Sequence, residues 1–293
     1  MNSEMNSIPI RTDLPTLEEF YFDALGPRKP MVIRAGSLDR VLEWKTDRWN
    51  ADYLARRAGS QTVRALHRKD PGGNYQPENT AYEKIMFRQF IDRTLRNPEG
   101  TDEWYLNLQS DRILEAPLLQ LLGDFRIPDF YCELPLRSIN VWIGKSRHSV
   151  TTPLHHDFNE NLYVIVRGTK RFSLFPPQCV RQLYPRGEVT GIDPVTGMVE
   201  YRDLRETFMP HLSQVDIENP DFDKFPAYRE VVDQRIDLEL HAGDLFYLPA
   251  CWLHQVHSLS GEHIALSFFG HPPEPEHIDV IMQRRRAVRG DVG

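Results

Sequence analysis

Cysteine is scarce in this chain of 293 residues, which contains three of them, Cys132, Cys179 and Cys251, and no CxxC pair. An odd and widely spaced set predicts neither a disulfide framework nor a cysteine-bound zinc site. Scarce, unpaired cysteines are typical of a reducing compartment. We therefore expect an intracellular protein of the cytoplasm, and the sequence leaves the nucleus open as the other compartment.

Long apolar runs are also missing. No segment approaches the roughly 18 consecutive apolar residues of a membrane-spanning helix. The first residues, MNSEMNSIPIRTDLP, are polar and lack the apolar core of a signal peptide. The sequence thus predicts no membrane partner, and a flexible N-terminus over residues 1–14.

The sequence also has no excess of basic residues. The chain has 35 lysines and arginines against 42 aspartates and glutamates, which gives a formal net charge of −7. Nucleic-acid-binding domains are usually basic, so this balance disfavours a nucleic-acid partner. One basic run, RRRAVR at 284–289, stands near the C-terminus, and we interpret it as the solvated face of a terminal helix.

Prolines and glycines are frequent by contrast. The 22 prolines and 17 glycines favour many turns and short strands over a helical bundle. Residues 15–110 alternate between helical and strand-like patterns, beginning with a capping box at Thr16 and Glu19. Further on we predict one amphipathic helix with the apolar residues Ile85, Phe87, Phe90, Ile91 and Leu95.

The pattern changes from residue 138 onward. Short apolar or alternating runs such as SINVWIGK, NLYVIVRG and HIALSFFG alternate with turns, which is typical of an all-β sandwich or barrel. The segment 184–235 is polar and rich in Asp, Pro and Gly, and we predict a long loop of functional type. Residues 273–293 predict one C-terminal helix with Ile278, Ile281 and Met282 on one face.

Two histidines and an aspartate lie side by side in TTPLHHDFNENLY, at 151–163. Side chains alternate along a strand, so His155 and Asp157 are predicted to share a face while His156 points away. A third ligand would come from His254 or His257 in PACWLHQVHSL, and at most one of these two faces the site. Two histidines and a carboxylate with open positions match the facial triad of non-haem iron oxygenases. A zinc hydrolase uses a similar set, so spacing alone does not choose the metal.

Lys170 lies in the strongly apolar hairpin VIVRGTKRFSLF. A buried lysine without a partner is costly, so an anionic ligand such as a dicarboxylate would explain its position. Thr152 and Tyr105 are candidates to add hydroxyl donors to the same carboxylate. The alternative is a solvent-facing lysine on an edge strand.

These blocks together resemble the Jumonji-C oxygenases. TTPLHHDFNENLYVIVRGTKRFSLFPP followed by HAGDLFYLPACWLHQVHSL is most similar to their small cupin-like hydroxylase branch. That branch includes the asparaginyl hydroxylase acting on hypoxia-inducible factor and a small lysyl hydroxylase acting on GTPases. SQVDIENPDFDKFP and WYLNLQS extend the match, and the resemblance covers roughly residues 15–272.

The resemblance implies a mainly β fold, a jelly-roll or double-stranded β-helix, that carries Fe(II) and the co-substrate 2-oxoglutarate and uses dioxygen. It implies one domain over 15–272, with N-terminal α/β elements at 15–110, the β-helix core at 138–272 and a C-terminal helix at 273–293. By resemblance the iron ligands, which are also the catalytic residues, are His155, Asp157 and His254. The residues implied to bind 2-oxoglutarate are Lys170, Thr152, Tyr105, Asn161 and Ser267. Ser267 stands where relatives often carry an asparagine.

The activity implied is that of a dioxygenase that hydroxylates a side chain of a protein or peptide. The same scaffold also supports N-methyl demethylation and hydroxylation of a tRNA base or a small molecule. A cupin-like binding protein without catalysis is an alternative of another class. A homodimer is expected by analogy with the family.

Overall fold

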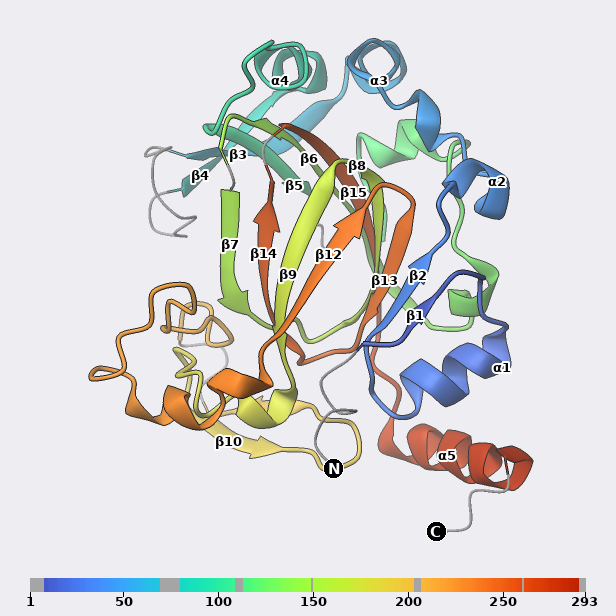
Figure 1. The fold of residues 1–293 in the computed structure, drawn as a ribbon. Helices are drawn as coiled ribbons and strands as arrows, with labels where there is room; N and C mark the ends of the chain where they lie inside the picture. The colour runs from blue at the N-terminus through green and yellow to red at the C-terminus, as the bar shows by residue number, and fades with distance from the viewer. Residues whose placement is uncertain are drawn as a thin grey trace.

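The computed structural model describes residues 8–68, 80–108, 113–148, 150–202, 207–259 and 261–289. Two facing β-sheets dominate this part of the chain (Figure 1). The larger sheet has the strand order β1-β2-β13-β8-β15-β6-β5-β3-β4. Its strands are β1 (Ile10–Arg11), β2 (Met31–Arg34), β3 (Thr62–Arg68), β4 (Thr80–Met86), β5 (Trp104–Leu108), β6 (Leu136–Ser146), β8 (Glu160–Arg167), β13 (Asp244–Leu248) and β15 (Gly261–Gly270).

The smaller sheet has the order β12-β9-β14-β7. Its strands are β7 (Val150–His155), β9 (Thr169–Phe175), β12 (Ile236–His241) and β14 (Leu253–Ser258). Ile165 and Phe246 of the larger sheet and Phe172 of the smaller sheet belong to one buried cluster, which forms the core between the sheets. The two sheets therefore enclose a common interior, and the predicted double-stranded β-helix is confirmed.

The N-terminal elements add helices to one side of the larger sheet. Near the start, the predicted capping box is present: Thr16 accepts from the Glu19 amide at 3.1 Å, and Glu19 accepts from the Thr16 amide at 2.8 Å. The helices are α1 (Leu17–Phe20), which continues as a π-helical turn at Tyr21–Leu25, α2 (Leu38–Leu42), α3 (Ala51–Ala58) and α4 (Phe87–Arg93). Short 3-10 turns lie at Thr46–Arg48, Leu118–Leu121, Asp129–Tyr131 and Pro177–Cys179. Of the predicted flexible N-terminus, residues 1–7 lie outside the described residues, whereas Ile10–Arg11 form β1.

The amphipathic helix is shorter at both ends than predicted, and α4 ends at Arg93, before Leu95. Ile85 belongs to strand β4, and helix α4 begins only at Phe87. Ile85 pairs with Val63 of β3, so sheet pairing decides the conformation of a stretch whose apolar spacing also fits a helix. Helices α3 and α4 cover the face of the β3–β4 hairpin that carries Val63 and Ile85, at the top of Figure 1.

The segment 184–235 is more ordered than the predicted polar loop. It contains the antiparallel strands β10 (Val189–Ile192) and β11 (Val199–Tyr201) and two 3-10 turns, Pro226–Glu230 and Val232–Gln234. Its scattered apolar residues form a second buried cluster with Phe175 and Leu253 of the smaller sheet. The prediction that the whole segment is a long polar loop was wrong because these contacts join residues distant in the sequence, which periodicity does not reveal.

The C-terminal helix α5 (Pro275–Arg289) packs on its own chain. Ile278 is buried, and Ile281 lies so close to Gly26 that a Cβ there would sit 2.8 Å from its side chain. Arg289 forms an ion pair of 2.7 Å with Asp23. The apolar stripe of α5 is thus occupied within the chain, and the homodimer stays a prediction. No helix in the described residues has the length and apolar character to cross a membrane.

Candidate metal centre

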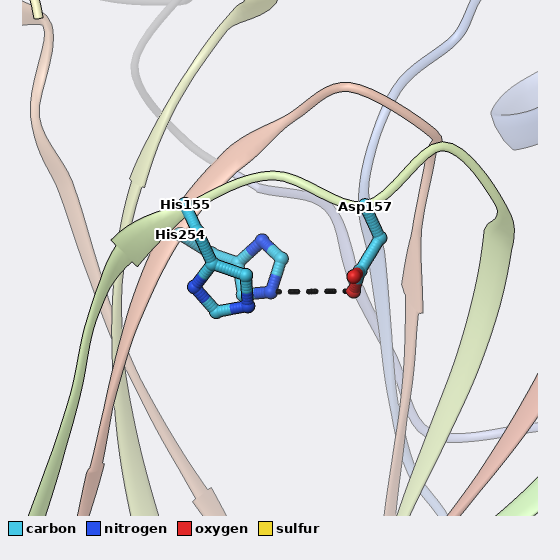
Figure 2. Close-up of side chains that lie close together, drawn as sticks. All are labelled: His155, Asp157 and His254. Atoms are coloured by element: carbon cyan, nitrogen blue, oxygen red, sulfur yellow. Dashed lines mark ion pairs between the residues drawn. The ribbon is translucent and has the colours of Figure 1, made fainter. Parts of the chain in front are cut away.

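Three predicted ligands meet at the end of the smaller sheet. His155 is the last residue of β7, His254 lies in β14, and these two residues are directly paired across the strands. One ligand atom from each of His155, Asp157 and His254 lies within 4.8 Å of the others. Figure 2 shows the two imidazoles beside the Asp157 carboxylate, with His254 Nε2 at 3.6 Å from Asp157 Oδ2. The described residues contain this one group of potential metal ligands.

Backbone contacts fix both imidazoles in one tautomer. Nδ1 of His155 donates to the Pro153 carbonyl at 2.7 Å, and Nδ1 of His254 donates to the Trp252 carbonyl at 3.0 Å. In the neutral ring the Nε2 lone pair is then free to bind a cation. Burial, and secondarily the neighbouring His155, hold the pKa of His254 well below its usual value, which favours this neutral form. The donor set therefore fits a divalent metal of the kind that binds imidazole and carboxylate.

The position of Asp157 has a different cause from the one predicted. Strand β7 ends at His155, so Asp157 lies in the following loop rather than two places along a strand. Its carbonyl accepts a hydrogen bond of 2.8 Å from the amide of Cys251, which ties this loop to the start of β14. The loop, not strand alternation, turns Asp157 toward the two histidines.

His156 points away from the centre, as predicted. It is fully buried, and its Nε2 lies 2.7 Å from the Tyr201 hydroxyl. Burial lowers the pKa of His156 to about 3, so it stays neutral in its pocket. His257 also faces away, with Nδ1 2.8 Å from the Thr151 hydroxyl and Nε2 3.0 Å from the Gln255 amide. His254 alone of the two candidates in β14 joins the centre.

A cavity of about 790 Å³ opens beside the centre, and His155 and Asp157 line it. Thr152, Tyr105 and Ser258 line the same cavity. Thr152 and His155 are three residues apart, and strict alternation would place them on opposite faces of β7. A register shift between the pairs His155–His254 and Thr152–Val256 brings both to the cavity.

Lys170 is buried behind this cavity, with 2% of its surface exposed. Its Nζ donates to the Tyr105 hydroxyl at 3.1 Å and to the Ser258 hydroxyl at 2.9 Å. It forms no ion pair with any acidic residue in the described part of the chain, and burial lowers its pKa to about 7. The alternative of a solvent-facing lysine is wrong. A ligand carboxylate would supply the missing counter-charge, so the pocket fits one end of a dicarboxylate.

Asn161 and Ser267 lie deeper than the cavity surface, and neither is among its lining residues. Asn161 in β8 is buried, and its Oδ1 has no hydrogen-bond partner among the described residues. Ser267 accepts a hydrogen bond of 2.8 Å from the Trp142 indole, and Trp142 lines the cavity. Ser267 therefore holds a wall residue in place, and its predicted direct contact with the co-substrate remains a prediction.

Two residues of the site escaped the sequence prediction. Ser258 stands four places after His254 on β14, so strand alternation would have placed it on the same face. His211 also lines the cavity, with its ring centroid 6.5 Å from that of His155 and 5.8 Å from that of His156. Burial lowers the pKa of His211 to about 4. His211 belongs to the segment predicted as a loop, and no local pattern signals it.

The family model described as "Cupin-like domain" matches residues 17–274, which is most of the chain. The chain belongs to the cupin-like domain family. Apart from strand β1, the two sheets and the His155–Asp157–His254 centre thus lie within the matched region.

Relatives of this cupin-like domain carry names from two kinds of chemistry. The chain is 30% identical to lysine-specific demethylase 8 of Danio rerio over 85% of its own length and 55% of the relative. It is 30% identical to lysine-specific demethylase JMJ30 of Arabidopsis thaliana, over 84% of this chain and 51% of the relative. It is 25% identical to tRNA wybutosine-synthesizing protein 5 of Gallus gallus, over 82% of this chain and 70% of the relative. The chain therefore spans about half the length of the two demethylases.

Proposed function

We propose that this cupin-like domain is an Fe(II)- and 2-oxoglutarate-dependent oxygenase that hydroxylates a side chain of a protein or peptide. The observation that carries the proposal is the pairing of two sites along one cavity. His155, Asp157 and His254 would serve as metal ligands, and buried Lys170 with its two hydroxyl partners would serve as an anion site. His155 and Asp157 of the first site and Tyr105 and Ser258 of the second line the same cavity. A zinc hydrolase gives Lys170, Tyr105 and Ser258 no comparable role.

In this proposal each group of residues has a separate binding role. His155, Asp157 and His254 would hold the iron, and Lys170, Tyr105 and Ser258 would hold the distal carboxylate of 2-oxoglutarate. When bound, the iron and 2-oxoglutarate supply the chemistry: dioxygen is reduced, one oxygen atom enters a substrate C–H bond, and the other leaves in succinate as CO₂ is released. The chain would hold the distal carboxylate directly and the metal through its three ligands, and this would orient the co-substrate.

The names of the relatives support a second reaction on the same scaffold. Two are called lysine-specific demethylases, and oxidation of an N-methyl carbon would lead to loss of that methyl group. Incubation of the protein with a cell lysate under dioxygen distinguishes the outcomes, because hydroxylation adds about 16 mass units and demethylation removes about 14. We expect the gain.

The direct test is an anaerobic titration with Fe(II) and 2-oxoglutarate, followed by the visible charge-transfer absorption of the iron chelate. The wild-type protein should develop the band. Lys170→Ala should raise the 2-oxoglutarate concentration needed by about 10- to 100-fold, because a charge-assisted bond to the carboxylate is lost. Iron affinity should stay nearly unchanged.

The matched control is Lys145→Ala, since Lys145 donates to the Asn97 carbonyl at 2.7 Å and does not line the cavity. This variant should titrate like wild type. Absence of the band in the wild type, with tight zinc binding in its place, would refute the proposed function. Equal loss of iron and 2-oxoglutarate binding in Lys170→Ala would make Lys170 a purely structural residue.

The affinity for 2-oxoglutarate should depend on pH through Lys170. With a pKa of about 7, Lys170 loses its proton in the free protein as the pH rises above that value. A bound carboxylate favours the charged form, so binding takes up a proton at high pH. Titrations between about pH 6.5 and 8.5 should show the affinity falling above pH 7, by at most about tenfold per pH unit. Lys170→Arg keeps its charge and should lose this slope; an equal slope in that variant would assign the effect to another group.

A further inference from the structure

The β3–β4 hairpin has two chemically different faces. Residues directly opposite each other across the strands share a face, and the pairs are Val63–Ile85 and Ala65–Glu83 on one side. On that side Val63 and Ala65 are buried under the helices α3 and α4, and Glu83 lies 2.6 Å from His67. Glu83, the acidic residue in the two described strands of the hairpin, is thus on the helix-covered side and lies beside His67.

The opposite face of the hairpin is cationic, and it turns toward the cavity. It carries Arg64, Arg68 and Lys84, with Leu66 and Tyr82 between them, and we call it the cationic face. Arg64, Leu66, Arg68 and Tyr82 line the cavity, and Lys84 lies beside Arg64 outside the lining. Arg64 stands directly opposite Lys84, and like charges in this position destabilise a hairpin. Neither side chain forms an ion pair with a described residue. An anionic partner would remove this repulsion.

The central arginine is held in place before any ligand arrives. The guanidinium carbon of Arg64 lies 4.0 Å from the centre of the Tyr82 ring. The Tyr82 hydroxyl in turn accepts a hydrogen bond of 3.0 Å from Asn107 of β5. Stacking uses the flat side of the guanidinium and leaves its edge N–H groups for a carboxylate. Such preorganisation lowers the cost of ordering a long side chain on binding.

Arginines of the cationic face also line the cavity, together with a further arginine from another strand. Among the described lining residues, Arg64, Arg68 and Arg137 are arginines, whereas Asp157 is the only carboxylate and belongs to the metal centre. Arg68 also donates to the Asp102 carbonyl at 3.3 Å, which anchors it within the wall. The described lining of the cavity therefore contains more arginines than carboxylates, although the whole chain has a net charge of −7.

We infer that the cationic face binds an acidic segment of the protein substrate, next to the residue that is oxidised. This inference deepens the proposed function and depends on it for the identity of the reaction. Carboxylates of aspartate or glutamate match the edge of Arg64 and the ammonium of Lys84. A peptide is favoured over RNA because a single-stranded nucleic acid requires free aromatic platforms along an extended basic groove. Here one side of Tyr82 is already covered by Arg64, and the chain as a whole is acidic.

The test compares two double variants of the full chain that change its charge equally. Arg64→Glu/Lys84→Glu reverses the cationic face. Arg40→Glu/Arg56→Glu reverses two exposed arginines on α2 and α3, away from the cavity. Each pair of reversals lowers the net charge by 4, from −7 to −11. The probes are rhodamine-labelled octaglutamate, labelled octalysine and a labelled single-stranded RNA 12-mer, measured by fluorescence anisotropy at low salt. Thermal melting checks that both variants are folded.

Octaglutamate should bind the wild type and the control variant with affinities within about twofold, and the reversed face at least about tenfold more weakly. Octalysine should bind more weakly than octaglutamate to the wild type. Equal weakening in both variants would overturn the inference, because net charge alone would then explain it. Tighter binding of RNA, lost on reversal of the cationic face, would also overturn it in favour of a nucleic acid. The charge-transfer band of the wild type is recorded in parallel, so failure of the oxygenase proposal shows separately as a missing band.

Discussion

Asp157→Ala should abolish turnover and weaken Fe(II) binding by more than about 100-fold. Even the loss of an outer partner of a ligand costs 10- to 100-fold in metal affinity, and Asp157 supplies the only charged ligand of the centre. The carboxylate also lies 3.6 Å from His254 Nε2, so its removal leaves two neutral imidazoles without the anion that attracts the cation. Metal affinity is measured by competition with a chelator, and turnover by succinate formation.

The neighbouring histidine provides the control for this prediction. His156 is adjacent to both ligands in sequence, but it bonds Tyr201 in a buried pocket. His156→Gln should lower the melting temperature while changing Fe(II) affinity by less than about tenfold. If His156→Gln and Asp157→Ala lost metal binding to the same extent, the assignment of the three ligands would be wrong.

Glu160→Ala should destabilise the fold by about 3–5 kcal/mol, because it leaves a buried charge without its partner. Glu160 is fully buried, and its Oε1 lies 2.6 Å from Arg28 Nη2, which is itself almost buried. The Tyr247 hydroxyl donates to the other carboxylate oxygen, and Arg28 Nε donates to the Thr196 carbonyl at 2.8 Å. This network joins the start of β8, three residues after Asp157, to β13 and to the turn that follows β10.

Urea unfolding of Glu160→Ala and of the double variant Arg28→Met/Glu160→Met measures this effect. The double variant removes both charges and should recover most of the lost free energy of unfolding, since apolar replacements of a buried pair are often neutral. A double variant as unstable as Glu160→Ala would mean that the hydrogen bonds from Tyr247 and to Thr196, rather than the unpaired charge, account for the loss.

Local patterns in the sequence identified several residues of the site, although strand alternation was not the reason that Asp157 faces the two histidines. His155 and Asp157 stand two apart in one short segment, and the apolar hairpin around Lys170 left a buried and a solvent-facing lysine as alternatives. The short strands from residue 138 onward are visible as apolar runs between turns. The resemblance to a family supplied the rest, including the choice of His254 over His257.

Features set by pairing over long distances were not predictable in this way. Ile85 forms a strand because it pairs with Val63, although its spacing also suits a helix. The register shift between β7 and β14 decides that Thr152 reaches the cavity together with His155. His211 approaches the centre only because residues 184–235 fold onto the smaller sheet. Each of these depends on contacts that a one-dimensional pattern does not contain.

The order of strands in the larger sheet has a consequence for solubility. Strands β1 and β4 are its two outer strands, and an outer strand offers unpaired backbone groups to other chains. Strand β1 is only two residues long, which leaves little for another chain to pair with. Strand β4 is longer, but Lys84 and Glu83 place charges of both signs along it. Edge-to-edge pairing between copies of the chain is therefore opposed at β1 by the short length of the strand and at β4 by its charged residues. Lys84, which we propose to attract an acidic partner, also helps to keep copies of this chain apart.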